Sequence, residues 1–83
     1  GPYLWALHLE SKWRAANPGT QKELESILSL YTKKDISAGE YGWGRDTPLK
    51  TGERMTRYSL MGEPLDVVFR SDDTISSIHT SYE

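Results

Sequence analysis

The side chains best suited to chemistry in this chain are two histidines and the hydroxyls near one of them. His79 lies two residues from Ser77 and two from Ser81, so all three point to one face of an extended strand. Nucleophilic catalysis also needs an orienting acid and an oxyanion hole, and no G-x-S-x-G elbow is present. We therefore interpret His79 as a polar residue on the solvent side of a sheet. His8 lies in an apolar stretch, where we expect it to be packed.

Metal and phosphate sites are not indicated either. With two His and no Cys, a transition-metal site would need carboxylates from distant segments. Asp72 and Asp73 lie in a polar turn that lacks the spacing of a calcium loop. The glycines at 39, 42 and 44 lack the dinucleotide-binding spacing. An 83-residue chain also has little material for a glycosidase cleft with paired carboxylates. We predict no metal, no cofactor and no enzymatic activity.

The segment around Trp43 is the best candidate for a contact surface. Glycines on both sides of Trp43 free the backbone and leave the indole without bulky neighbours. Trp, Tyr and Arg are enriched at binding hot spots. The alternative is that Trp43 folds back to complete a small core. The candidate partner-binding residues are Tyr41, Trp43, Arg45 and Asp46.

The charge balance argues against nucleic acid as a partner. Ten Lys and Arg face twelve Asp and Glu, for a net charge of −2, whereas phosphate binding usually requires a basic surplus. The basic residues between 45 and 57 are interspersed with acidic ones, so we expect a mixed solvated surface. The basic members are Arg45, Lys50, Arg54 and Arg57.

The apolar run Tyr3–Leu9 has two interpretations. Gly1-Pro2 looks like the remnant of a cleaved tag, which leaves residues 3–83 as one domain. The run is either the buried first turns of a helix or the end of a longer hydrophobic segment that anchors the chain upstream of Tyr3. Aromatic residues followed by Lys12 and Arg14 are typical of the interfacial end of a spanning helix. The candidate membrane-proximal residues are Tyr3, Leu4, Trp5 and Leu7.

Two helices should precede the sheet. A first helix over 3–16 carries an apolar stripe at residues 5, 9, 13 and 16, and Asn17-Pro18-Gly19 ends it. The spacing Thr20-x-x-Glu23 is a capping box that begins a second helix. Its stripe continues through Tyr31, so we expect this helix to end near Lys34 or Asp35, with Lys33 and Lys34 in its last turn.

The rest of the chain predicts an antiparallel meander. Residues 54–61, 65–70 and 75–82 alternate in polarity and are joined by short turns. Leu65, Val67 and Phe69 share one side of the middle strand, and Asp66 the other. One covered face and one wet face follow from this pattern. A short piece at 40–43 could add a fourth strand. We predict a two-layer α+β domain in which two N-terminal helices pack on one face of a three-stranded, or alternatively four-stranded, antiparallel meander.

This order and the ending from Leu65-Asp-Val-Val-Phe-Arg-Ser-Asp-Asp-Thr-Ile to Ser-Ser-Ile resemble the small outer-membrane assembly lipoproteins of the SmpA/OmlA type. The resemblance covers about thirty residues of the chain. It implies the two-layer architecture and a bacterial envelope setting, and no functional residue is carried over from it.

These features together predict a non-catalytic protein-interaction domain. We expect it to be the periplasmic part of a membrane-tethered bacterial envelope protein, with a cytoplasmic location as the alternative. The last strand, from Ile75, is a candidate free edge for strand addition by a partner protein. Two alternatives stay open: a small inhibitor or immunity-type protein, and a glycan- or peptide-binding module that uses the Tyr41–Trp43 loop.

Overall fold

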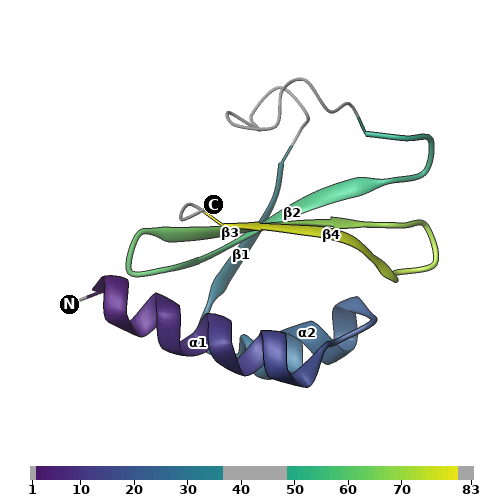
Figure 1. Cartoon of the computed structure of the whole chain (residues 1–83). Coiled ribbons are helices and arrows are strands. Elements are labelled where there is room, and N and C mark those ends of the chain that lie inside the picture. The colour runs from purple at the N-terminus through teal and green to yellow at the C-terminus, as the bar shows by residue number, and fades with distance from the viewer. Residues whose placement is uncertain (1, 37–48, 81–83) are drawn as a thin grey trace.

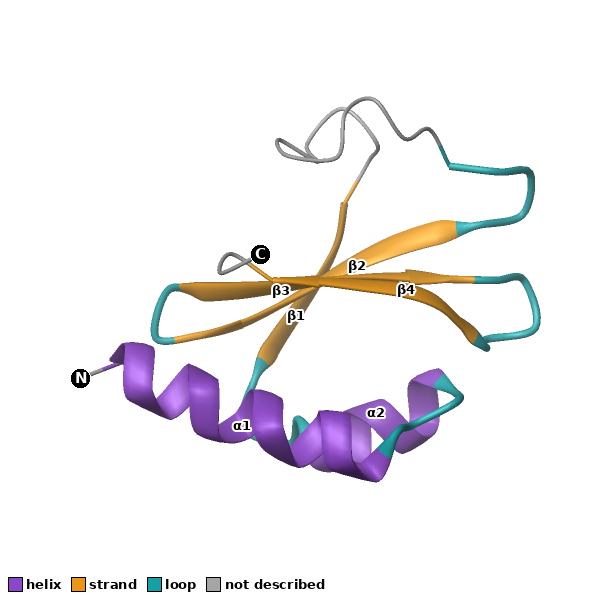
Figure 2. Ribbon diagram, in the orientation of Figure 1, coloured by secondary structure: helices purple, strands orange, loops and turns teal. Residues whose placement is uncertain are grey.

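The computed structural model describes residues 2–36 and 49–80; the side chains of 2–7, 9 and 80 lie outside this description. The predicted α+β class is confirmed, with two helices and a four-stranded antiparallel open sheet (Figure 1). Figure 2 shows both helices on the same side of the sheet. The elements are α1 (Pro2–Ala16), α2 (Gln21–Ile27), β1 (Thr32–Ile36), β2 (Arg54–Leu60), β3 (Glu63–Phe69) and β4 (Ile75–Thr80).

Helix α1 begins at Pro2, one residue before the predicted start, and ends at Ala16 as predicted. Proline suits a first helical position, because its missing N–H has no helical acceptor there. Asn17 ends the helix with φ of 48°, a left-handed conformation that asparagine tolerates. Trp13 is buried, but Ala16 and His8 are exposed, contrary to expectation. At 3.6 residues per turn, the step of five positions from His8 to Trp13 turns the histidine well away from the packed side.

The capping box at the start of α2 is confirmed. The Glu23 N–H donates to the Thr20 hydroxyl at 3.2 Å, and the Glu23 carboxylate accepts from the Gly19 N–H at 3.3 Å. The Thr20 hydroxyl also donates to that carboxylate. These bonds satisfy donors that the first helical turn leaves without partners.

The predicted length of α2 is wrong. The helix ends at Ile27 with Leu28 as its cap, and Lys33 and Lys34 lie in strand β1. Leu28 is buried and Tyr31 packs on the same core, so the apolar stripe was real. Its spacing did not distinguish a longer helix from a turn followed by a strand. Pairing of Lys33 with Tyr58 on β2 decides the strand, because tertiary pairing overrides weak helical propensity.

Short connections fix the register of the meander. Strands β2 and β3 are joined by Met61 and Gly62, whose φ angles of 53° and 85° are those of a type I′ turn. The turn between β3 and β4 is the predicted Asx turn, in which Asp72 Oδ1 accepts from the Thr74 N–H at 3.0 Å. The fourth strand is β1; the piece at 40–43 that could have supplied it lies outside the described residues.

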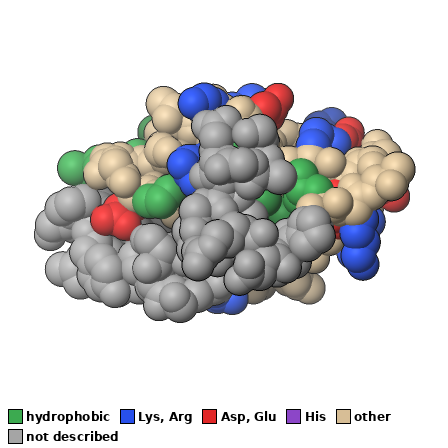
Figure 3. Space-filling model, turned by 90° about the horizontal axis from the view of Figure 1, so that it is seen from above, with side chains coloured by type: hydrophobic (Ala, Val, Ile, Leu, Met, Phe, Trp, Pro, Cys, Tyr) green, Lys and Arg blue, Asp and Glu red, His purple; other side chains and the backbone are tan. Residues whose placement is uncertain are grey.

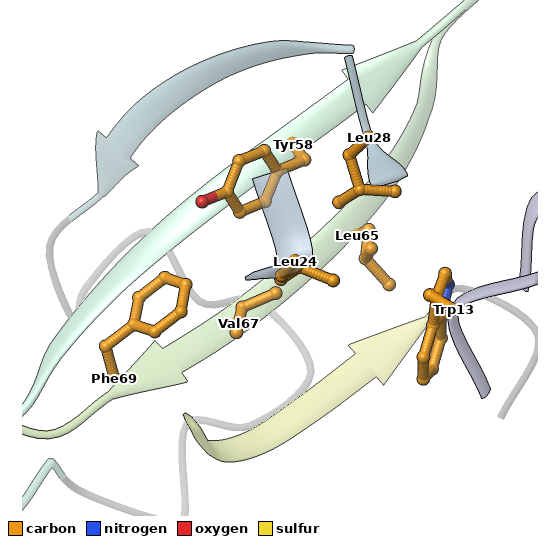
Figure 4. Packing of buried hydrophobic residues seen from close by; sticks show 7 residues of the cluster. All are labelled: Trp13, Leu24, Leu28, Tyr58, Leu65, Val67 and Phe69. Carbon is orange, nitrogen blue, oxygen red and sulfur yellow. The ribbon is translucent and has the colours of Figure 1, made fainter. Parts of the chain in front are cut away.

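One core cluster joins both helices to the sheet. Figure 4 shows Leu24 of α2 and the cap residue Leu28 over Tyr58, Leu65 and Val67, with Trp13 of α1 beside β4. As predicted, the three alternating apolar residues of β3 all face this cluster. Its buried members are Trp13, Leu24, Leu28, Tyr58, Leu65, Val67 and Phe69.

The face of the sheet opposite the helices is less exposed to solvent than expected. Ile36, Met55 and Val68 form a second buried cluster there, and Asp66, predicted to face solvent, is wholly buried. Its carboxylate accepts two bonds from Arg57, at 2.7 and 2.9 Å, which compensate the burial of its charge. Figure 3 views this helix-free side, where basic and apolar side chains are interspersed in the described part.

Candidate functional site

The outer edge of β4 is the feature best placed to bind another chain. β4 is the last strand of the sheet, with β3 on its inner side. Alternate residues of such a strand direct N–H and C=O groups outward. Among residues 2–36 and 49–80, the only backbone pairing on the outer side is near the start of the strand. The Ile75 N–H donates there to Gly19 O, and the Gln21 N–H to Asp73 O.

The two edge strands differ in charge. β1, at the opposite edge, reads Thr-Lys-Lys-Asp-Ile, and its first four residues are exposed. Lysine on an edge strand discourages pairing with other chains. β4 reads Ile-Ser-Ser-Ile-His-Thr and carries no Asp, Glu, Lys or Arg. The protected edge is therefore β1, and β4 lacks that protection.

A β-bulge sets which side chains of β4 face the helices. Ile75 pairs with Phe69 and Ser77 with Val68, so Ser76 is an extra residue in the ladder. Simple alternation would put Ile75 and Ile78 on opposite faces, as the sequence pattern predicted. The bulge shifts the alternation by one. Both isoleucines consequently pack against the helix-side core.

A pocket lies beside β4 on this helix side. It has a volume of about 260 Å³ and is lined by Trp13, Arg14, Asn17, Pro18, Ile75 and Ile78; we call it the edge pocket. The described lining combines an indole, a proline ring and two isoleucines with the polar side chains of Arg14 and Asn17. Arg14 is its one charged residue. The guanidinium lies 4.6 Å from the centre of the Trp13 ring and binds Glu10 at 3.0 Å.

The link between the helices is bonded to the sheet at several points. Besides the backbone bonds to β4, the Arg54 guanidinium on β2 binds both Gln21 and Asp73. It also stacks 5.2 Å from the centre of the Phe69 ring. The bonds at Gly19 and Gln21 hold the chain directly after Asn17 and Pro18 against the sheet.

The helix-free side of β4 holds Ser77 and His79 together. The Ser77 hydroxyl and His79 Nε2 are 2.9 Å apart, as their spacing predicts. Asp66 is the cross-strand partner of His79, a neighbour the sequence pattern did not reveal. Both Asp66 oxygens are bonded to Arg57, so an ion pair orients this carboxylate. A hydroxyl against an imidazole is one component of a nucleophilic site, and a surface hydrogen bond accounts for it equally well.

A second, polar depression lies near the start of β4. It has a volume of about 270 Å³ and is lined by Lys50, Thr51, Glu53, Arg70, Ser71 and Ser76. The Lys50 N–H donates to Glu53 at 2.7 Å. This bond, with one from Ser76, holds the pKa of the Glu53 carboxyl below its usual range. These bonds close the turn before β2, which explains the depression without a ligand.

The sequence-predicted contact residues are only partly placed by the structure. Tyr41, Trp43, Arg45 and Asp46 lie outside the described residues. Tyr3, Leu4, Trp5 and Leu7 lie in α1, whose backbone is described there and whose side chains are not. In the described part, no helix has the length and apolar character needed to cross a membrane. Within the same ranges no three His, Asp or Glu side chains gather as a metal site.

Two basic residues of the predicted mixed surface, Arg54 and Arg57, are paired with carboxylates. Arg54 and Arg57 are three residues apart on β2, so they point to opposite faces. Arg54 binds Asp73 on the helix side, and Arg57 binds Asp66 on the other. The two arginines do not share a patch.

Comparison with known family models, curated proteins and solved structures finds no match for this chain.

Proposed function

We propose that this chain is a non-catalytic protein-interaction domain that binds an extended segment of a partner protein along β4. The observation that carries the proposal is the contrast between the two edges of the sheet, with charge on β1 and none on β4. In strand addition the backbone supplies affinity through its hydrogen bonds, and flanking side chains supply specificity.

The helices and the sheet act in this proposal as a two-layer unit. The helix layer covers the core side through Trp13, Leu24 and Leu28. A strand added to β4 extends the sheet layer without displacing either helix. The partner then needs only a segment in extended conformation, and the domain needs no large rearrangement.

We further propose that the domain belongs to a membrane-tethered bacterial envelope protein and faces the periplasm. The apolar run Tyr3–Leu9 supports a tether on the N-terminal side. Two large apolar side chains, Leu30 and Met61, have 75% and 68% of their surface exposed. Both lie at the end of the β1–β2 ladder where Thr32 pairs with Ser59. An apolar run of about 20 residues encoded directly upstream of Tyr3 would support the tether. A polar upstream segment would refute it.

Binding along β4 can be tested with peptides selected from a phage-displayed library of random dodecapeptides. Each selected peptide is resynthesised with N-methyl groups at alternate residues, in one set or the other. A paired strand donates N–H groups to its neighbour from every second residue, so we expect one set to abolish binding and the other to leave it intact. Equal binding of both sets would contradict strand addition.

A matched pair of variants distinguishes β4 from other sites. Ser77→Lys places a charge on the proposed edge, and Ser59→Lys places it on the same face of the central strand β2. We expect Ser77→Lys to weaken peptide binding and Ser59→Lys to leave it unchanged. Thermal melts check that both variants fold. The reverse order of effects would exclude β4 as the site.

A further inference from the structure

The edge pocket lies where an added strand on β4 would place its side chains. In a sheet, side chains of neighbouring strands stand side by side on each face, with directly opposite Cβ atoms about 5 Å apart. Ile75 and Ile78 line the pocket and face the helix side of β4. Every second side chain of an added strand would therefore point to the helix side, and one of them would lie over the pocket.

The lining determines which side chain fits. Trp13 has 5% of its surface exposed, and with Pro18 and the two isoleucines it forms an apolar wall. An apolar side chain entering this half-open pocket is partly removed from water by contact with this wall. A polar side chain there would lose hydrogen bonds to water without replacing them.

Charge complementarity defines a second feature of the partner. Among the described residues that line the pocket, Arg14 is the charged one and none carries a carboxylate. The Arg14 side chain keeps 52% of its surface exposed while it binds Glu10. A partner carboxylate next to the apolar residue would approach a cation, whereas a partner cation would meet one of like sign.

Resting on the proposed function, we infer that the partner segment is an extended peptide with a large apolar residue that fills the edge pocket and a nearby acidic residue that meets Arg14. The occupant is thus a segment of another protein. A second copy of this chain is a poorer fit, because β4 itself carries no acidic residue.

The dodecapeptides selected on the full chain test this inference. We expect them to share one large apolar position with an acidic residue near it. Changing that apolar residue of the peptide to alanine should weaken binding tenfold or more, since each buried methylene contributes about 0.8 kcal/mol. The indole N–H resonance of Trp13 should shift when the parent peptide binds, and shift less with the alanine peptide.

Variants of α1 test the charge. Arg14→Gln should weaken acidic peptides by roughly two- to fivefold, the range of an exposed ion pair. Lys12→Gln removes the same charge from an exposed position outside the pocket lining, and should leave binding unchanged. Asn17→Asp adds a carboxylate to the pocket wall in a residue type that tolerates the left-handed backbone. It should also weaken acidic peptides.

The outcomes separate this inference from the function on which it rests. If N-methylation shows strand pairing and Ser77→Lys weakens binding, but the apolar residue and Arg14 have no effect, the pocket inference is wrong and the proposed function stands. If neither N-methyl set abolishes binding, the proposed function itself fails. A concentration-dependent dimer that is lost in Ser77→Lys would make a second copy the occupant and overturn the inference.

Discussion

At the scale of single residues, the molecule compensates buried polar groups one by one. Tyr58 is 2% exposed, and its hydroxyl donates to Glu25 at 2.6 Å. Burial, and then the bond to Glu25, raises the pKa of Tyr58 well above its usual value. Burial raises the pKa of Glu25 as well, but the bonds from Tyr58, Lys33 and Gln21 outweigh it and leave that pKa below its usual 4.5.

The pKa of Glu25 makes stability depend on pH. A carboxyl whose folded pKa is lowered binds protons more weakly in the folded than in the unfolded state, so its contribution is complete above about pH 4.5. It is lost as pH falls through the lower, folded value. We expect Glu25→Gln to cost about 1 kcal/mol at pH 7 and less at pH 3. Urea unfolding at both pH values measures the difference. An equal cost at pH 3 and pH 7 would contradict this assignment.

Asp66 is the residue whose burial the sequence did not reveal. Alternation along β3 placed it on a face expected to be wet, and only the pairing of β2 with β3 brings Arg57 opposite it. We expect Arg57→Leu to lower the free energy of unfolding by about 2–3 kcal/mol, because it leaves a buried carboxylate unpaired.

A double variant controls for the lost side chain. Arg57→Leu combined with Asp66→Leu removes both charges, and should recover part of the stability lost in Arg57→Leu. Denaturant unfolding of wild type, both single variants and the double variant closes the cycle. A double variant less stable than either single one would show that the pair is not the source of the effect.

At the scale of elements, the turn and cap motifs predicted where helices and turns begin and end. The spacing of apolar residues predicted the type of element only in part. The capping box at Thr20, the break at Asn17 and the Asx turn at Asp72 are local motifs, and all three are confirmed. The identity of β1 depends on pairing with β2, which is distant in sequence. Leu28 and Tyr31 can reach the core either from a longer helix or from a turn that leads into a strand. No local pattern could therefore have distinguished the two.

The same limit applies to the site. The position of β4 as an outer strand of the sheet was predictable, because it follows from the order of three strands and short turns. The edge pocket was not. It depends on the bulge at Ser76, which brings Ile75 and Ile78 to one side, and on the approach of Pro18 to that side. In the sequence, the only trace of this bulge is the odd spacing between Ile75 and Ile78, which regular alternation would place on opposite faces.

The turn between β2 and β3 offers a prediction at this scale. Met61 is exposed and has φ of 53°, a conformation that costs a residue other than glycine about 1–2 kcal/mol. Asn-Gly is the preferred pair for a type I′ turn. We expect Met61→Asn to stabilise the protein by about 0.5–1 kcal/mol, measured by thermal or denaturant unfolding. Met61→Val should destabilise it, and an equal effect of both would exclude the backbone explanation.

At the scale of the whole molecule, the sheet has one edge that carries charge and one that does not. The helices lie on one side, and the short turns fix the register. Within residues 2–36 and 49–80, the backbone link through Gly19 occupies only the start of the outer edge of β4. The net charge of −2 favours neither nucleic acid nor an anionic surface as a partner. We therefore propose strand addition at β4, with the edge pocket selecting among partner segments.

Amide hydrogen exchange of the full chain, with and without a selected peptide, tests this central claim most directly. An added strand would provide hydrogen-bond acceptors for the outward N–H groups of β4. The hydrogen exchange of these amides should therefore slow about tenfold or more when most of the protein is bound. The exchange of β1 amides should not change. Slowed exchange at β1, or at neither edge while the peptide is bound, would contradict the account.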